Sequence, residues 1–115
     1  MMIIFLHIKV LRSGLLEPAD LPDLVAGVRE AAKDAEEAVG RHLIVLSGLL
    51  PEWGFAALSH DLLSSTAVPA VAICDYERFG GKAGVVALSR SPDYKVGDIV
   101  ALDGEDVLVV DFPFC

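Results

Sequence analysis

Short apolar runs alternate with segments of helical periodicity, and this alternation constrains the fold more than any other feature of the chain. The apolar runs cover residues 2–11, 42–47 and 67–75. Continuous apolar runs of this length are typical of strands buried on both faces of a parallel sheet. Between them lie predicted helices at 21–39 and 53–64. The order β-α-β-α-β predicts an α/β, Rossmann-like fold with parallel core strands and two main helices.

The first predicted helix has clear boundaries and one apolar face. Asp20 is a candidate N-terminal cap, Pro22 lies in the first turn, and Gly40 provides the stop. The apolar face carries Leu21, Leu24, Val25, Val28 and Ala32, while the charged residues lie mostly elsewhere. The segment therefore reads as a surface helix packed on a sheet.

The C-terminal part is rich in strand and turn signals. A further strand is predicted at 84–89, and turn chemistry follows at 91–98. Residues 98–112 resemble an antiparallel hairpin around Asp103-Gly104. With 115 residues, division would leave two pieces too small to bury a core, so we expect one domain over 1–115 with a mixed sheet.

Composition indicates which partners the chain suits. Hydrophobic residues make up 54% of it, above the roughly 45–50% of ordinary soluble chains, and this favours a homodimer that buries a face. Nine Lys and Arg against seventeen Asp and Glu give a net charge of −8. No basic stripe is visible, so duplex DNA and anionic membranes are poor partners. A local site for a small anion remains compatible with this charge.

Two features favour a cytoplasmic protein. The apolar residues 1–11 lack a basic leader and a small-residue cleavage site, so they read as a buried strand, neither a signal peptide nor a membrane span. Cys74 and Cys115 show no disulfide framework and no metal-binding spacing, which suits a reducing compartment.

Ligands of α/β sheets gather at the carboxyl ends of the parallel strands. Ser47-Gly48 and Asp75 are predicted to lie at this rim, and Ser89-Arg90-Ser91 would join them if strand 84–89 runs the same way. An antiparallel strand would move that third segment. The helix that begins near Trp53 would direct backbone N–H groups at the rim, and the indole could stack on a base or wall a pocket.

Each of these residues also has a plain structural interpretation. Ser47-Gly48 is a common strand-to-helix turn, and Trp53 suits a core or a dimer interface. His60, next to an aspartate in mid-helix, suits a solvated polar pair. Asp75 fits a cap and a site residue equally well. The sequence contains no G-x-S-x-G, P-loop, G-x-G-x-x-G or H-E-x-x-H signature, so the residues alone indicate a small acidic α/β subunit with an anion or nucleotide site.

Several motifs in register resemble one known family. SGLLPEW (47–53), the following Ser-His (59–60), VAICDYER with Asp75 and Arg78, GVVALS, and SPDYKVGDIV (91–100) occur in the order found in the small CRISPR-associated ring nucleases of type III systems, the "Csx-three" family. The resemblance covers roughly residues 42–102. The N-terminal third matches only in predicted structure.

The resemblance implies a specific activity in antiviral defence. Such proteins have a Rossmann-like fold related to cyclic-oligoadenylate sensors, form dimers, and hold the small cyclic RNA cyclic tetra-adenylate between two dimers. They hydrolyse it with a divalent metal, usually manganese. Carried over by position, Ser47 and Gly48 would meet the phosphates, Asp75 would be the acidic residue needed for activity through metal binding or activation of the attacking group, and Arg78 would contact a phosphate.

Departures from the family pattern keep alternatives open. Residues 61–67 lack the family's histidines, Arg90 stands where a histidine is common, and Leu49-Leu50 follow the Ser-Gly pair. His60 could substitute for a missing histidine as a catalytic residue, and Arg90 would favour binding an anion over acting as a base. The alternatives to a ring nuclease are therefore an inactive cyclic-oligoadenylate sensor or sponge, and a purely structural dimerising subunit.

Overall fold

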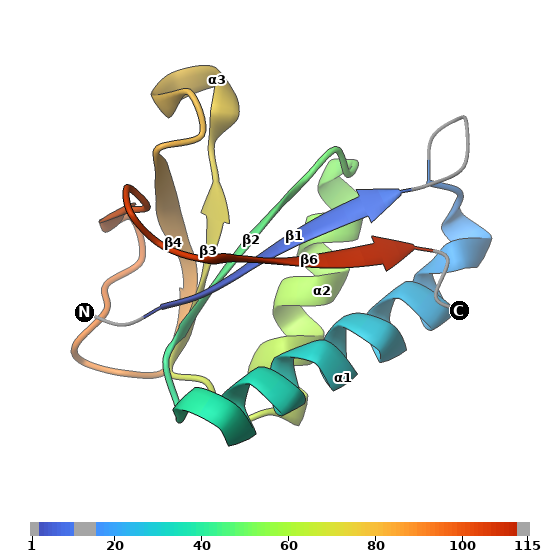
Figure 1. Ribbon diagram of the computed structural model, residues 1–115, viewed down its shortest axis with the longest axis horizontal. Helices are drawn as coiled ribbons and strands as arrows, with labels where there is room; N and C mark the ends of the chain where they lie inside the picture. Colours follow the sequence, from blue (N-terminus) through green and yellow to red (C-terminus); the bar gives the residue numbers. More distant parts are fainter. Residues whose placement is uncertain (1–2, 11–15, 113–115) are drawn as a thin grey trace.

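A computed structural model of the chain describes residues 3–10 and 16–112 (Figure 1). Its strands form one six-stranded sheet in the order β5-β4-β3-β2-β1-β6. The strands are β1 (Ile3–Val10), β2 (Leu43–Gly48), β3 (Ala70–Cys74), β4 (Ala83–Ser89), β5 (Ile99–Ala101) and β6 (Val107–Phe112). The helices are η1 (Pro18–Asp20), α1 (Leu21–Val39), α2 (Glu52–Ser65) and the single turn α3 (Tyr76–Phe79).

The strand directions confirm the predicted mixed α/β class. β1 runs parallel to β2 and β6, and β2 runs parallel to β3. β4 is antiparallel to β3, and β5 is antiparallel to β4. The core of the sheet is therefore parallel, as the continuous apolar runs predicted, and one edge is antiparallel.

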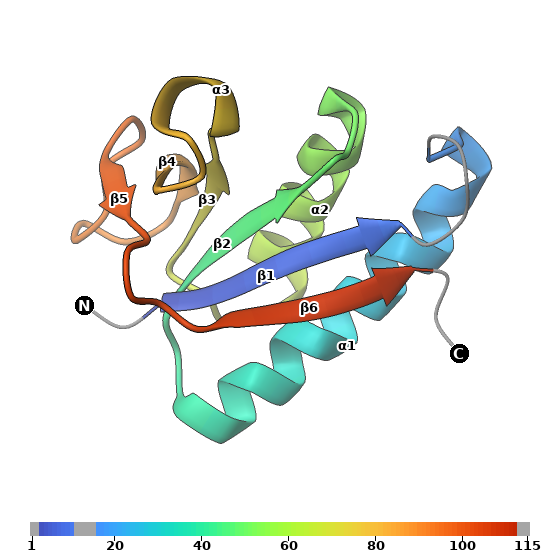
Figure 2. The same ribbon diagram turned by 45° about the horizontal axis from the view of Figure 1, so that its top comes forward.

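The hairpin predicted over 98–112 does not form. β5 and β6 lie at opposite edges of the sheet, because the chain after the turn at Asp103-Gly104 crosses to pair with β1 (Figure 2). Burial explains the crossing: Val110 and Phe112 are 7% and 3% exposed in the core beneath the helices. The antiparallel pairs of the C-terminal half are β3 with β4 and β4 with β5 instead.

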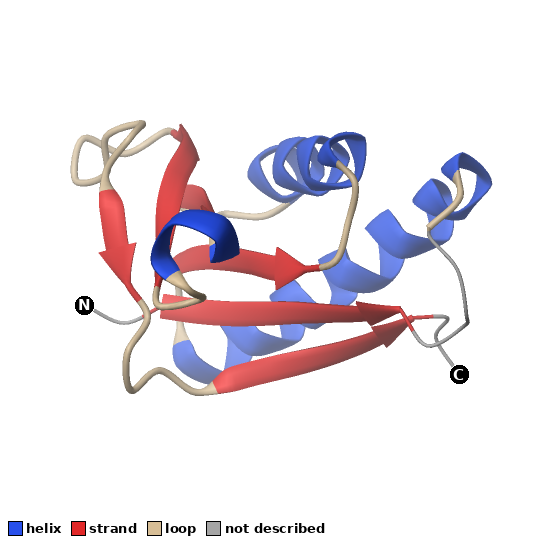
Figure 3. Cartoon of the chain, turned by 90° about the horizontal axis from the view of Figure 1, so that it is seen from above, coloured by secondary structure: helices blue, strands red, loops and turns tan. Residues whose placement is uncertain are grey.

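Both main helices cover the same face of the sheet (Figure 3). The core under them contains Leu6, Ile8, Leu24, Val28, Ile44, Leu46, Leu58 and Leu62, all at most 1% exposed. A two-point ion pair joins the helices: Arg29 Nη2 lies 2.7 Å from Asp61 Oδ1, and Arg29 Nε donates to Asp61 Oδ2 at 2.9 Å. The opposite face carries a smaller cluster that includes Phe5, Val45, Ala72, Val86 and Val100.

The helical layer ends at α2. The connection from β3 to β4 contains only α3, a four-residue turn, so the described chain places no long helix over β3 and β4 (Figure 2). Within residues 3–10 and 16–112, no helix combines the length and apolar character needed to cross a membrane.

Candidate functional site

The carboxyl ends of β2 and β3 share one pocket, which we call the rim pocket. Its volume is about 570 Å³, and its lining includes Gly48, Glu52, Cys74, Asp75, Tyr76 and Glu77. β2 ends at Gly48 and β3 at Cys74, and these two strands are parallel neighbours. Their ends therefore meet at one edge of the sheet, as predicted for the Ser-Gly turn and the aspartate.

Gly48 is required by the backbone around it. Its φ is +141°, and a Cβ at this position would lie 2.5 Å from the carbonyl oxygen of Ile8 on β1. Side chains do not fit such a position, so the glycine lets β2 turn sharply beside β1. The interpretation of Ser47-Gly48 as a strand-to-helix turn therefore explains why residue 48 is a glycine. The backbone of Gly48 also lines the rim pocket.

Ser47 lies within the sheet and does not line the rim pocket. It is 1% exposed, and its hydroxyl is 2.9 Å from Nδ1 of His7, its register partner on β1. Burial raises the pKa of the Cys74 thiol, and a hydrogen bond with Ser47 opposes that rise. Ser47 thus joins three neighbouring strands, and the predicted contact with ligand phosphates does not follow from its position.

Asp75 is both a helix cap and a residue of the rim pocket, the two roles that the sequence left open. It caps α3, because its Oδ1 accepts a hydrogen bond from the backbone N–H of Arg78 at 3.0 Å. Its Oδ2 lies 3.7 Å from Nε of Arg78. The side chains of Asp75 and Arg78 are 36% and 75% exposed, so both are accessible to solvent, and Arg78 lies beside Asp75 without lining the rim pocket itself.

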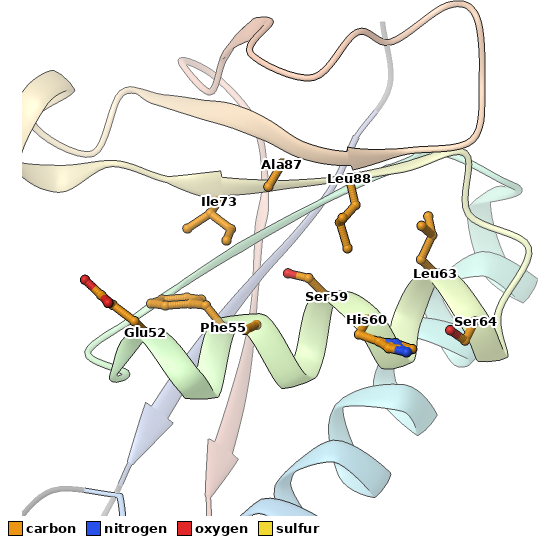
Figure 4. Close-up of a pocket in the computed structure, with 10 residues that line it drawn as sticks. Glu52, Phe55, Ser59, His60, Leu63, Ser64, Ile73, Ala87 and Leu88 are labelled. Carbon is orange, nitrogen blue, oxygen red and sulfur yellow. The ribbon is translucent and has the colours of Figure 1, made fainter.

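The remaining predicted site residues lie elsewhere. His60 lines an adjoining groove along α2 (Figure 4), and Trp53 is 40% exposed without lining the rim pocket. Arg90 is at the opposite end of the sheet, because β4 is antiparallel. Its guanidinium donates to the carbonyl oxygens of Val68, Thr66 and Leu63, which tie the end of α2 to β4. Arg90 was expected at the rim only if strand 84–89 ran in the same direction, and the antiparallel direction of β4 moves it away.

The described residues do not suit a metal centre. No three His, Cys, Asp or Glu side chains among residues 3–10 and 16–112 come together in a group that could hold a metal ion. Asp75, the predicted metal ligand, has one oxygen in its cap and the other beside Arg78. Cys115 lies outside the described residues. Glu52, Asp75 and Glu77 all line the rim pocket, but they do not converge into a group of ligands that could hold a metal ion.

Sequence reasoning missed His7, which lies next to the predicted site. His7 is half-buried in β1 and bonded to Ser47. Lys9 follows on the same face of the strand and is exposed. The available signal was two polar residues in an otherwise apolar run. The sequence does not show that this strand lies beside β2, in register with Ser47.

A comparison with protein families gives one match for this chain. The model of a family described as "CRISPR-associated protein (Cas_csx3)" matches residues 9–101. The matched range contains β2, α2, β3 and β4, and so both strands whose ends form the rim pocket. No curated protein is similar enough to the chain to match it.

Proposed function

Because the chain belongs to the CRISPR-associated Cas_csx3 family, we propose that it binds cyclic tetra-adenylate at the rim pocket and hydrolyses it. One observation carries the proposal: the turn at Gly48 and the carboxylate of Asp75, from two different strands, line a single pocket of about 570 Å³. A pocket of this size is within the range of small-molecule sites.

The chain's own residues suit binding more clearly than chemistry. Arg78 has an exposed guanidinium, which can form a two-point contact with a phosphate. The backbone of Gly48 lines the pocket, although the space of its missing side chain is filled by the Ile8 carbonyl. Asp75 holds the loop that carries Arg78, and its accessible oxygen can orient an attacking water. Three acidic side chains line the same pocket, so phosphates need cations from more than one copy of the chain.

A second copy of the chain would supply the further cations that the ligand phosphates need. β6 pairs with β1 along one side only within the described residues, and Val107, Leu108 and Val109 are 48%, 46% and 51% exposed. Consecutive exposed apolar residues on an edge strand favour pairing with another chain. We therefore place the homodimer contact at β6 in this proposal, with the ligand held at rims from more than one copy.

We derive no step through manganese, because the described residues form no group that fits a metal ion. The same observation favours a second candidate function, a sensor or sponge that binds the ligand without cleaving it. His60 strengthens that alternative, since it does not line the rim pocket and so is not in place to replace a catalytic histidine there.

Incubation with cyclic tetra-adenylate, with and without Mn²⁺, tests the proposal. Linear products from the wild type that disappear in Asp75→Asn would support hydrolysis. Asparagine keeps a cap acceptor for the Arg78 N–H and removes the charge, so it separates chemistry from folding better than alanine. Binding without products would select the sensor. Absence of both binding and products would overturn the proposed function.

A further inference from the structure

An apolar groove runs along α2 on the side away from α1, and we call it the α2–β4 groove. Phe55, Ser59 and Leu63 line it from α2, and Ile73 and Leu88 line it from β3 and β4 (Figure 4). Its volume is about 750 Å³. The groove occupies the place where a further helix would cover the sheet, because the connection between β3 and β4 contains only the short α3.

A buried hydroxyl in this groove lacks a partner. Ser59 is 3% exposed, and its Oγ has no hydrogen-bond partner among the described residues. Figure 4 shows this oxygen directed from α2 toward the space between the helix and the strands. A buried polar atom without a hydrogen bond is unfavourable, so the position favours an occupant that brings a polar group to it.

The two ends of the groove differ in charge. Glu52 lines one end, and the acidic Asp75 and Glu77 line the adjoining rim pocket. Near the other end, Arg90 donates to the backbone carbonyls of Leu63, Thr66 and Val68, so its guanidinium already lies at the C-terminal end of α2 and does not line the groove. The groove is therefore acidic at the Glu52 end, where basic side chains of an occupant would be favoured.

The dimensions also suit a helix. α2 has 14 residues, which corresponds to a length of about 21 Å at 1.5 Å per residue. A second helix of about the same length would lie alongside it and complete the helical layer over β3 and β4. Its apolar stripe would contact Phe55, Leu63 and Leu88.

The described part of this chain does not offer such a helix to another copy. α1 buries Leu24, Val28 and Ala32, and α2 buries Leu58 and Leu62, so both apolar faces are already used in their own core. A second copy would also bring the same acidic rim residues rather than basic ones. Self-association through this groove is therefore disfavoured.

We propose that the α2–β4 groove docks an amphipathic helix of about 14 residues from another protein. The partner helix has an apolar stripe interrupted by one side chain that hydrogen-bonds Ser59, and basic residues near the end that lies beside Glu52. This inference does not depend on cyclic oligoadenylate binding. The α2–β4 groove adjoins the rim pocket and shares Glu52, Phe55, Ile73 and Ala87 with it, but the test contains no nucleotide.

The probe is a displayed library of random 16-residue peptides, selected on the immobilised full-length protein. The expected result is enrichment of peptides with apolar residues at i, i+3 or i+4 and i+7, with Lys and Arg gathered toward one end. The most enriched peptide is then synthesised. Its affinity for the wild type, for Leu88→Asp and for Ser59→Ala is measured by fluorescence polarisation.

Leu88→Asp should weaken peptide binding by about tenfold or more, because it places a charge in the apolar wall. Val96→Asp is the matched control, since Val96 is 69% exposed and lies outside the groove lining, so its binding should match the wild type. Ser59→Ala should change peptide affinity and protein stability in different ways. It should weaken the peptide while leaving the melting temperature of the free protein unchanged or higher, because alanine removes an unpaired hydroxyl.

Three outcomes would overturn the proposal. The first is a selection that enriches no peptide for the wild type over the Leu88→Asp variant. The second is an enriched peptide that binds the Leu88→Asp variant as tightly as the wild type. The third is a wild-type dimer in sedimentation that Leu88→Asp converts to a monomer while Val96→Asp does not, since a second copy would then occupy the groove.

Discussion

At the scale of single residues, Asp75 shows how one carboxylate can hold a loop and face a pocket together. Its Oδ1 caps α3 and its Oδ2 lies beside the guanidinium of Arg78. The sequence predicted that Asp75 would end a buried strand, and this is confirmed. The sequence alone does not distinguish a helix cap from a site residue. The distinction depends on whether the backbone N–H groups of the following residues turn toward the carboxylate.

Asp75→Ala should destabilise the fold by about 1 kcal/mol, since a lost helix cap costs about that much. Asp75→Asn should cost clearly less, because the amide oxygen can accept the same hydrogen bond from the Arg78 N–H. Urea unfolding followed by circular dichroism measures both variants. Equal losses in the two variants would mean that the charge, and not the cap, is what stabilises this loop.

The Cys74 thiol should react slowly with alkylating reagents. Burial raises its pKa, so the reactive thiolate is scarce near neutral pH, and the side chain is only 8% exposed. The measurement is the rate of labelling at pH 8 in a Cys115→Ser variant, compared with the same variant in urea. We expect labelling at least tenfold slower in the folded state. Equal rates would show that Cys74 is accessible.

At the scale of elements, the best-predicted parts are those whose sequence pattern settles their packing. The helix expected over 21–39 is α1 (Leu21–Val39), because its apolar residues repeat with helical period between a first-turn proline and Gly40. β6 was misplaced, because Val107, Leu108, Val109 and Val110 read equally well as a hairpin strand. Its position beside β1 depends on burying Val110 and Phe112 under α1, which no local pattern reveals.

The pairing of α1 with α2 should depend on pH in the acid range. The hydrogen bond with Arg29 lowers the pKa of Asp61 below its ordinary value of 3.8, so the ionised form is favoured in the folded state. The stabilisation is therefore complete above the unfolded pKa and is lost as the pH falls through the folded pKa. Asp61→Asn should lower the melting temperature by a few degrees at pH 7.

The difference between the wild type and Asp61→Asn should shrink as the pH falls below about 3.8, because the wild-type carboxylate is then protonated as well. Asp34→Asn on α1 is the control, since Asp34 is exposed and outside this ion pair. Thermal melts between pH 2.5 and pH 7 provide the comparison. A difference that stays constant over this range would show that the ion pair does not stabilise the helices.

At the scale of the whole molecule, the class of the fold and the shared rim followed from the order of the elements. The carboxyl ends of parallel strands meet at one edge, so Gly48 and Asp75 could be brought together from the sequence alone. Arg90 could not be placed, because the direction of β4 depends on the short connection through α3. His7 was missed, because strand order decides which residue faces Ser47.

The homodimer proposed at β6 should dissociate when charge is added there. Leu108→Lys and Val109→Lys place ammonium groups on an exposed edge and should convert a dimer to a monomer without unfolding it, since both positions are about half exposed. Val96→Lys serves as the control on an exposed loop position. Sedimentation velocity measures the state. A dimer that survives both edge substitutions would place the contact on another surface.

Calorimetric titration of cyclic tetra-adenylate measures whether the rim pocket holds the ligand. Arg78→Ala should weaken binding by about tenfold or more, because its guanidinium is the cation beside Asp75 at the rim. Arg41→Ala removes the same charge from an exposed position just before the amino end of β2 and should bind as the wild type does. Equal affinity for wild type and Arg78→Ala, or no binding at all, would show that the ligand is not held at this rim.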